Sequence, residues 1–297
     1  MNKQDLQVLC QLAITAARAA GDIITRSRQL DVNVQYKAVG SSAASQVVTQ
    51  VDLQAQLAIL EIITPTCTEY NLALVAEESD DDGLRQQKTA FWCIDPMDGT
   101  LAFINKTTGF SVSIALVSRQ GKPLIGVVYN QVNQDLYYAI DGAGAYKNEQ
   151  RIRTPKLDPK LALILYTDSS FETHPLLEQT RSCLQEIAQS LALNGADIQY
   201  KIGAVMNACD VLETANSCYF KYPRLDDSGG SIWDYAATAC LFNEADAIAA
   251  DISGKPMDLN RINNTFMNHR GVLFTGQLKL AEQIISLSRR LLNATDS

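Results

Sequence analysis

Helix-like and strand-like segments alternate along this 297-residue chain, and the alternation constrains the fold more than any other feature of the sequence. Residues 4–30 carry Leu, Ala and Ile at helical spacing, whereas 111–117 and 124–129 are short apolar runs punctuated by Gly and Pro, as strands are. No segment recurs at a fixed period, which argues against a repeat architecture. Because alternating helices and strands pack in layers, the sequence predicts an α/β or α+β fold. Periodicity alone does not order the strands.

The same patterns predict the individual elements and a domain boundary. Helices are expected at 4–30, 52–63, 175–193, 204–215 and 277–292, and another opens near Trp233. Strands are expected at 32–36, 72–76, 91–94, 111–117, 124–129, 135–140, 161–166, 198–202, 218–222, 247–250 and 272–275. The small and polar stretch 38–46 predicts a mobile loop. A polar stretch with two prolines at 151–160 predicts an N-terminal α+β domain at 1–157 and a C-terminal α/β domain at 158–297.

Charge and cysteine content limit the partners and the compartment. A formal net charge of −8 argues against binding to a nucleic-acid polymer, whose phosphates need cationic partners. It allows a phosphorylated small molecule if the site supplies a cation, as a bound metal would. The seven cysteines include no C-x-x-C pair, which favours a reducing compartment. The N-terminus does not resemble a signal peptide and no apolar run approaches about 20 residues, so we expect a cytoplasmic protein without a membrane span.

Histidine is scarce in this chain, with two residues, so hydrolytic chemistry would depend on carboxylates. Three short acidic segments are candidates. Glu77-Glu78 follows one expected strand, Asp95 and Asp98 follow the next, and Asp234 lies at the start of an expected helix. Each acid taken alone also fits an ordinary helix cap or turn residue, so the functional hypothesis depends on the three segments occurring together.

The segment Asp95-Pro96-Met97-Asp98-Gly99-Thr100 has specific physical consequences. Pro96 restricts the backbone, and Gly99 allows a ligand to approach the chain closely. If a helix begins at Thr100, its free N–H groups would bind an anion such as phosphate. A divalent cation held between carboxylates and phosphate would neutralise both, and oxygen-only ligands favour Mg²⁺ over zinc.

Together, the three segments resemble the signatures of the inositol monophosphatase superfamily of Mg²⁺-dependent, Li⁺-sensitive phosphomonoesterases. Those signatures are a Glu-Glu pair, Asp-Pro-x-Asp-Gly-Thr and Trp-Asp-x-Ala, and the similarity extends over nearly the whole chain, including 109–116, 126–129 and 141–146. The resemblance implies a layered αβαβα sandwich of the inositol monophosphatase and fructose-1,6-bisphosphatase type. It places the active site between the two halves.

The resemblance also implies a role for each acid. Glu77, Asp95 and the carbonyl of Met97 would hold one Mg²⁺. A second Mg²⁺ would be held by Asp95, Asp98 and Asp234, and a third, weaker ion would lie near Glu77.

The implied catalytic group consists of Asp52, Glu77 and Thr100. Asp52 would hydrogen-bond Thr100, and this pair with Glu77 would orient a metal-bound water for in-line attack on phosphorus. The Gly99 and Thr100 N–H groups would hold the phosphate. The expected substrate-contacting residues are Asp98, Gly99, Thr100, Leu101, Tyr222, Arg224 and Asp234.

The substrate itself is open at this stage. Tyr222-Pro223-Arg224 resembles a segment of the bacterial 3′(2′),5′-bisphosphate nucleotidase branch, and Arg224 would meet a second phosphate. This favours cleavage of 3′-phosphoadenosine 5′-phosphate to AMP and phosphate. However, the linker from Arg224 to Trp233 is longer and more acidic than that branch prefers, and a solvated Arg224 at a strand end is the alternative. Inositol 1-phosphate and other polyol phosphates remain candidates, and fructose 1,6-bisphosphate is a weaker one.

Several residues have simpler interpretations that stay open. Lys37 would approach the site or be an ordinary solvated lysine, and the run Asp80-Asp81-Asp82 is expected to be a solvated loop. Ala76 replaces a glycine usual before the Glu pair, and Leu101 stands where a polar residue is frequent. The chain could also be a metal-binding regulatory protein without turnover. Dimers are frequent among similar proteins, so a homodimer is one candidate assembly, although the sequence does not fix the oligomeric state.

Overall fold

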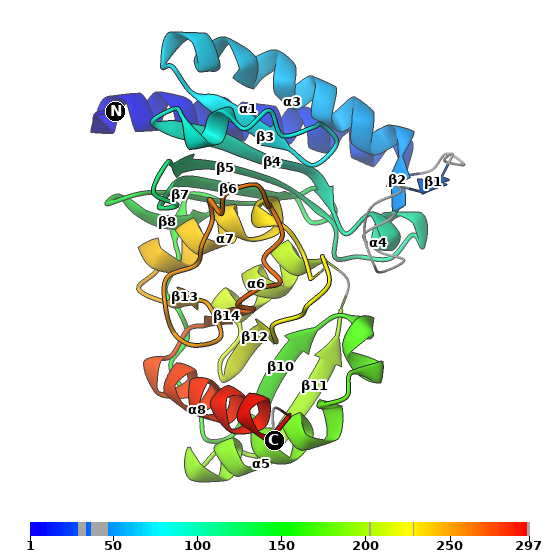
Figure 1. Cartoon of the computed structure of the whole chain (residues 1–297), viewed down its shortest axis with the longest axis vertical. Coiled ribbons are helices and arrows are strands. Elements are labelled where there is room, and N and C mark those ends of the chain that lie inside the picture. The colour runs from blue at the N-terminus through cyan, green and yellow to red at the C-terminus, as the bar shows by residue number, and fades with distance from the viewer. Residues whose placement is uncertain (29–33, 37–46, 202, 228, 296–297) are drawn as a thin grey trace.

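A computed structural model describes residues 1–28, 34–36, 47–201, 203–227 and 229–295, and the expected loop at 38–46 and Lys37 lie outside these ranges. Figure 1 shows five layers. Helices α1 (Lys3–Ser27) and α3 (Gln50–Glu69) cover a seven-stranded sheet, and α6 (Ala204–Glu213) and α7 (Ile232–Glu244) lie between it and a five-stranded sheet. Helices α5 (Leu177–Ser190) and α8 (Leu278–Thr295) cover the far face. This arrangement confirms the αβαβα sandwich.

The larger sheet has its strands in chain order. It consists of β3 (Ala73–Ala76), β4 (Ala90–Asp98), β5 (Ser111–Ser118), β6 (Pro123–Asn130), β7 (Asp135–Ile140), β8 (Gly144–Lys147) and β9 (Gln150–Arg151). Strands β3 and β4 are parallel, and each later pair is antiparallel. The parallel pair matters for the site because the carboxyl ends of β3 and β4 therefore meet at one edge. A separate antiparallel pair joins β1 (Val34–Tyr36) to β2 (Val47–Thr49).

The smaller sheet has a crossed order, β11-β10-β12-β14-β13. Its members are β10 (Leu163–Thr167), β11 (Ala196–Tyr200), β12 (Ser217–Lys221), β13 (Ile248–Ala250) and β14 (Val272–Thr275). Strands β11, β10 and β12 are parallel, and β14 runs antiparallel to both of its neighbours. The first sheet ends at Arg151 and the second begins at Leu163. The division into domains at 157/158 stays a prediction.

Three apolar cores follow from these layers. One lies beneath α1 and α3, a second surrounds α6 and α7 between the sheets, and a third lies under α5 and α8. The middle core explains why β4 and β5 are apolar along almost their whole length: helices cover both of their faces, so both sets of alternating side chains are buried. The acidic residues of β4, Asp95 and Asp98, lie in the C-terminal part of this strand.

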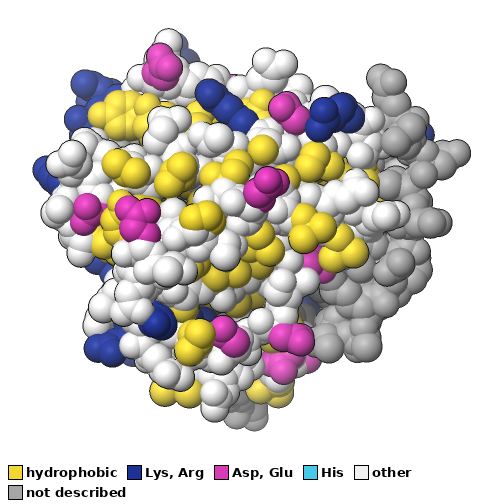
Figure 2. All heavy atoms as spheres, turned by 90° about the horizontal axis from the view of Figure 1, so that it is seen from above, with side chains coloured by type: hydrophobic (Ala, Val, Ile, Leu, Met, Phe, Trp, Pro, Cys, Tyr) yellow, Lys and Arg dark blue, Asp and Glu magenta, His cyan; other side chains and the backbone are white. Residues whose placement is uncertain are grey.

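Helix α1 qualifies one expectation about membranes. Among the described helices it is long and apolar enough, by length and composition alone, to cross a bilayer. Half of that stretch is buried inside the protein, and it packs on α3 and β6. Viewed from the α1–α3 side, Figure 2 shows apolar side chains interspersed with Lys, Arg, Asp and Glu rather than a continuous apolar surface. These contacts are typical of a core helix.

Most expected elements are present, with two instructive differences. Helix α3 continues past Ile63 through Pro65 to Glu69. Its last turn lacks the apolar repeat because Thr66 is buried through polar contacts, accepting from the Trp92 indole at 2.8 Å and donating to the Ile63 carbonyl at 2.6 Å. Strands β8 and β9 are too short for a hydrophobic period to reveal. All seven cysteines are free thiols.

Candidate metal centre and active site

The acidic segments converge where β3 and β4 end and α7 begins. Ala76 pairs with Ile94 in the parallel ladder, and the Glu77 N–H donates to the Ile94 carbonyl at 3.0 Å. Glu77 therefore lies directly after β3, whereas Asp95 lies inside the neighbouring β4, which continues to Asp98 instead of ending at Ile94 as the sequence predicts. The register of β4 against β5 then shifts between Asp95 and Asp98, so the chain bends at the proline-containing turn.

Three carboxylates form a compact cluster. One oxygen from each of Asp95, Asp98 and Asp234 lies within 4.8 Å of the others. Asp95 is 1% exposed and Asp98 is 6% exposed, whereas Asp234 is partly exposed. The Asp95 Oδ2 atom is buried and has no hydrogen-bond partner among the residues that the structure describes, a costly state for a carboxylate unless a cation is its partner. This orphaned oxygen and the all-oxygen donor set fit a hard divalent cation such as Mg²⁺.

Burial and mutual repulsion raise the pKa values of these acids. The pKa of Asp95 lies well above its ordinary value because of burial and then the nearby Glu77 charge. The pKa of Asp98 is raised by burial and then by Asp234. Burial, followed by Glu77, raises the pKa of Asp234 to about 6. Since a cation would favour the ionised forms, the cluster is expected to bind metal with release of protons.

These pKa values predict that the metal-free protein loses stability as the pH rises. The pKa of Asp234 is about 6 against an ordinary 3.8, so the folded state binds more protons than the unfolded state between these values. The resulting stability is present below about pH 4 and is lost as the pH rises through about 6. With EDTA, we expect the melting temperature at pH 8 to lie about 5 °C below that at pH 5, measured in matched buffers.

Saturating Mg²⁺ should restore the stability lost at pH 8 and so remove this difference, because it stabilises the ionised carboxylates that repel one another without metal. A melting temperature that is independent of pH in EDTA would contradict the assignment of buried, repelling acids to this cluster.

Asp52 lies behind the cluster and connects α3 to the turn. Its Oδ2 accepts from the Thr49 N–H at 2.7 Å and from the Thr49 hydroxyl at 2.6 Å, while its Oδ1 accepts from the Thr100 hydroxyl at 3.0 Å. Burial raises the pKa of Asp52 to about 6, against the opposing hydrogen bonds from Thr49. Asp52 is thus the third-residue member of the α3 capping box, whose N-cap is Thr49, and also a partner of Thr100, so the capping interpretation is confirmed and the catalytic one stays a prediction.

Asp234 has the same double character. It is the third residue of α7, and the Ser231 N–H donates to its Oδ2, which makes a capping box. Its other contacts are with the carboxylates of the cluster. The cap fixes the position of one oxygen and leaves the second available.

Two helix N-termini lie beside the acidic residues in the chain or in space. Helix α4 (Thr100–Ile104) begins after Gly99, which has φ +86°, and within the described part of the chain no side chain caps it. Its first N–H groups have no intrahelical partners. The N-terminus of α6 instead meets Asp98, which accepts from the Ala204 N–H at 3.2 Å and the Val205 N–H at 2.9 Å.

The structure separates the expected substrate residues. Leu101 is half-buried in the first turn of α4, beside Gly99 and Thr100. The Tyr222 side chain is buried in the core under α5, and its hydroxyl lies 2.9 Å from the Thr180 hydroxyl. It therefore does not face the carboxylate cluster. Arg224 is more accessible, and its guanidinium pairs with Asp226 at 3.0 Å.

Three features near the site have a weak sequence signal. Lys221 ends β12, pairs with Asp168 at 2.9 Å, and lowers the pKa of Asp234 by its charge. The sequence signal for Lys221 was a charged residue at the end of an otherwise largely apolar strand. Gln56 on α3 accepts from the Glu78 N–H and donates to Ser79, holding the first acidic segment. The α6 N-terminus contributes backbone groups only, which no residue type reveals.

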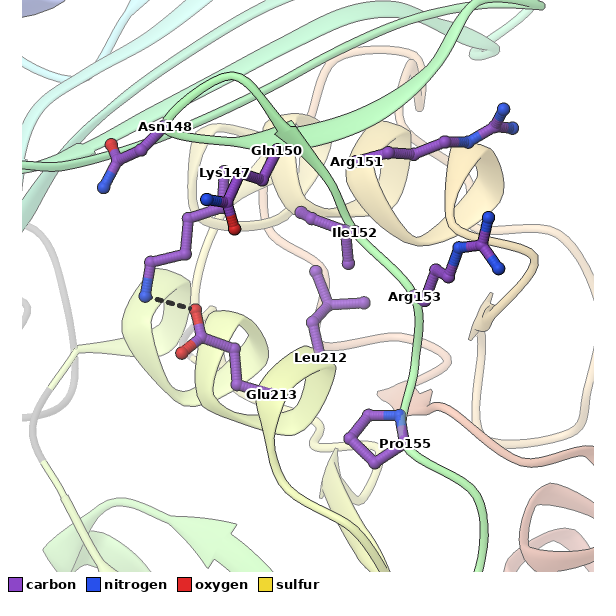
Figure 3. Close-up of a pocket in the computed structure, with 9 residues that line it drawn as sticks. All are labelled: Lys147, Asn148, Gln150, Arg151, Ile152, Arg153, Pro155, Leu212 and Glu213. Atoms are coloured by element: carbon purple, nitrogen blue, oxygen red, sulfur yellow. Dashed lines mark ion pairs between the residues drawn. The ribbon is translucent and has the colours of Figure 1, made fainter.

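A cavity of about 480 Å³ lies elsewhere on the protein, lined by Lys147, Asn148, Gln150, Arg151, Ile152, Arg153, Pro155, Leu212 and Glu213. Figure 3 shows it between the β8–β9 region and the C-terminal end of α6. Lys147 pairs with Glu213 at 2.7 Å, while Arg151 and Arg153 point away from that pair. None of the acids of the cluster lines it.

Comparisons with known proteins agree with this site. A profile of the inositol monophosphatase family matches residues 5–293. The 3′(2′),5′-bisphosphate nucleotidase CysQ of Escherichia coli K12 is 31% identical over 259 residues, which cover 85% of this chain and 93% of that protein. The Nus factor SuhB of Vibrio cholerae is 30% identical over 266 residues, covering 89% of this chain and 92% of the relative.

Two further comparisons bear on the substrate and the fold. The inositol-1-monophosphatase of Bacillus subtilis is 27% identical over 256 residues, covering 86% of this chain and 87% of that enzyme. The solved structure of inositol monophosphatase II from Staphylococcus aureus covers 94% of each chain with a TM-score of 0.70 at 22% identity, which supports the shared fold. With its clustered acids and a family match over almost its whole length, this chain belongs to the inositol monophosphatase family, whose members are phosphoric monoester hydrolases.

Proposed function

We propose that this phosphatase hydrolyses 3′(2′),5′-bisphosphate nucleotides, releasing AMP and phosphate from 3′-phosphoadenosine 5′-phosphate, in the cytoplasm and with two or three Mg²⁺ ions. The observation that carries the hydrolytic chemistry is the buried Asp95–Asp98–Asp234 cluster, with its orphaned Asp95 oxygen, beside the uncapped N-terminus of α4. Carboxylates there would hold the cations, and helix N–H groups would hold a phosphate.

The residues divide the work as follows. Glu77, Asp95 and the Met97 carbonyl would hold one Mg²⁺, and Asp95, Asp98 and Asp234 another. When bound, the metal would neutralise phosphate charge and lower the pKa of the attacking water. The Gly99 and Thr100 N–H groups would orient the phosphate.

Asp52 and Thr100 would position that water. The Thr100 hydroxyl donates to Asp52 at 3.0 Å, which leaves its lone pairs able to accept a hydrogen bond from a water. Asp52 is itself fixed by two hydrogen bonds from Thr49, so the direction of this acceptor is set by the fold. Glu77, whose charge raises the pKa of Asp52, would take part in holding the same water.

Arg224 supports the bisphosphate substrate, since a guanidinium gives paired hydrogen bonds to a second phosphate. Its neighbour Asp226 occupies it in the structure, so binding would exchange one anion for another. The relatives named as bisphosphate nucleotidases support the same choice. The second candidate is inositol-1-monophosphatase or another polyol phosphatase, which the half-buried Leu101, the occupied Arg224 and the Bacillus relative favour.

Phosphate release should be compared as kcat/KM on 3′-phosphoadenosine 5′-phosphate, inositol 1-phosphate and fructose 1,6-bisphosphate. The proposal expects the nucleotide to be preferred. It also expects Arg224→Gln to lower kcat/KM for the nucleotide by about 10- to 100-fold, the worth of a hydrogen bond to a charged group, and to leave inositol 1-phosphate unchanged.

Arg181→Gln is the matched control. Arg181 lies on α5, is accessible like Arg224, and has an acidic partner, Glu178, at 4.0 Å, but it is not among the expected substrate residues. A preference for inositol 1-phosphate that Arg224→Gln does not alter would assign the polyol alternative. Mg²⁺ binding without turnover of any ester would favour a non-catalytic, metal-binding regulatory protein.

A further inference from the structure

Arg85 is a fully buried arginine in the loop between the first acidic segment and β4. It lies in a short 3₁₀ helix, η1 (Leu84–Gln86), and is 1% exposed. Its Nε donates to Asp81 Oδ2 at 2.7 Å, so Asp81 is more than the solvated loop residue that the sequence predicts. Burying a guanidinium is costly unless its donors are satisfied. The acceptors that satisfy these donors therefore show which parts of the chain Arg85 holds together.

The remaining acceptors of Arg85 come from a segment some 175 residues away in the chain. Its Nη1 donates to Asn260 Oδ1 at 2.6 Å and to the Arg261 carbonyl at 2.9 Å, and its Nη2 reaches the Asn264 carbonyl at 3.4 Å. Asn260 is 8% exposed and returns a hydrogen bond to the Arg85 carbonyl at 3.3 Å. Gln86 adds a donor to Asn260 Oδ1 at 2.9 Å.

This distant segment in turn holds the start of α7. The Ile232 N–H donates to the Thr265 carbonyl at 2.9 Å, and the Met267 N–H donates to the Gly230 carbonyl at 2.9 Å. Ser231 forms a β-bridge with Phe266, two residues after Asn264. Since Ser231 caps α7 by donating to Asp234, the 260–268 segment fixes the backbone from which Asp234 projects.

On its other side, Arg85 fixes the loop that carries Glu77. Asp81 lies four residues beyond Glu77, and its Oδ1 accepts from the Gly83 N–H at 3.0 Å. Gln56 holds the same loop from α3 through the Glu78 N–H at 3.0 Å. One side chain thus connects the loop of Glu77 to the 260–264 segment, and the residues that follow this segment hold the start of α7.

We propose that Arg85 is a positioning residue that sets the spacing between Glu77 and Asp234, and thereby the affinity of the carboxylate cluster for Mg²⁺. The inference rests on the proposed metal-dependent function but assigns a role that lies outside the cluster. The hydrogen bonds of the Arg85 guanidinium go to Asp81, Asn260, Arg261 and Asn264, none of which is among the proposed metal ligands. Its five donors, arranged as a planar fork, can engage both loops at once, which a lysine cannot do.

The test is a titration of the full-length protein with Mg²⁺ alone. Binding is measured by calorimetry and, separately, by the rise in melting temperature that Mg²⁺ causes. Arg85→Gln is expected to weaken Mg²⁺ binding by about 10-fold or more, the range seen when groups supporting metal ligands are removed. Asn260→Ser, a milder change in the same network, should weaken it in the same direction. Arg119→Gln is the control, because its exposed side chain takes no part in this network although its carbonyl accepts from Asn260.

A split in kinetics separates positioning from general damage. At saturating Mg²⁺, Arg85→Gln should recover kcat to within about threefold, with the loss confined to the Mg²⁺ concentration needed for half activity. Arg85→Lys should weaken Mg²⁺ binding as well, since charge alone does not bridge the loops. Mg²⁺ affinities within twofold of the parent in both Arg85→Gln and Asn260→Ser would overturn the proposal. If the parent cleaves no ester, the proposed function fails, and the binding titration still decides the role of Arg85.

Discussion

Replacing Asp95 with asparagine is expected to lower kcat/KM by on the order of 1,000-fold while making the metal-free protein more stable. Asp95 is buried at the centre of the cluster, and one of its oxygens has no donor. Losing a carboxylate ligand removes several kcal/mol of charge stabilisation from the transition state, and about 4 kcal/mol corresponds to that factor. Without metal, however, the same substitution removes a charge that repels Glu77, so the melting temperature in EDTA at pH 8 should rise.

The opposite signs of these two effects make the prediction specific. Calorimetric melts with and without Mg²⁺ should show that the variant has lost the stabilisation that Mg²⁺ gives to the parent. Asp80→Asn is the matched control, since it removes an equal charge from an exposed residue of the loop after Glu77 and should change neither property. A variant that retains both its activity and its response to Mg²⁺ would show that Asp95 is not a metal ligand.

Gly203→Ala is expected to lower kcat/KM by about 100-fold and to destabilise the fold by about 3 kcal/mol. Gly203 has φ +94°, and a Cβ there would lie 2.0 Å from the Gly109 carbonyl oxygen and 2.9 Å from Asp98 Oδ2. Relief of this overlap must move the α6 N-terminus away from Asp98. The Ala204 and Val205 N–H groups would then lose their hydrogen bonds to that carboxylate, which raises its pKa further and weakens metal binding.

Gly142→Ala provides the control, because Gly142 also has a positive φ, +74°, but no atom lies within 4 Å of the added Cβ. It should cost about 1 kcal/mol of conformational strain and leave kcat/KM unchanged. Thermal melts and Mg²⁺-dependent kinetics of both variants distinguish the two cases. Equal activity in the two variants would show that the contact between α6 and Asp98 does not support the site.

The elements that the sequence predicted well are those whose pattern is local. Residues 4–30 show a helical period because one side of α1 packs on α3 and the sheet, and the observed helix spans Lys3–Ser27. The short strands β8 and β9 and the end of α3 at Glu69 were missed. The end of α3 depends on a polar contact between distant residues, Trp92 and Thr66, whereas β8 and β9 are too short to show a hydrophobic period.

The site shows the same limit in more detail. The spacing within Asp95-Pro96-Met97-Asp98-Gly99-Thr100 requires its two acids to flank one turn, whatever the rest of the chain does. By contrast, Tyr222 and Arg224 are two residues apart and have different surroundings, since the first is in the core and the second is at the surface. The spacing of residues along the chain does not predict which side chain is buried and which is exposed just after a strand ends.

The sequence by itself determined most of the helices and strands, the layered class of the fold and the acidic segment at the end of β4, because side-chain period and turn chemistry act over a few residues. The family resemblance already grouped Asp234 with Asp95, and the structure brings them together, but only the tertiary structure decided that the α6 N-terminus contacts Asp98 and that Arg85 joins two loops some 175 residues apart. Each of these depends on how the two sheets pack around α6 and α7. The free energy of such contacts comes from burial and charge shared between distant segments, which no local pattern records.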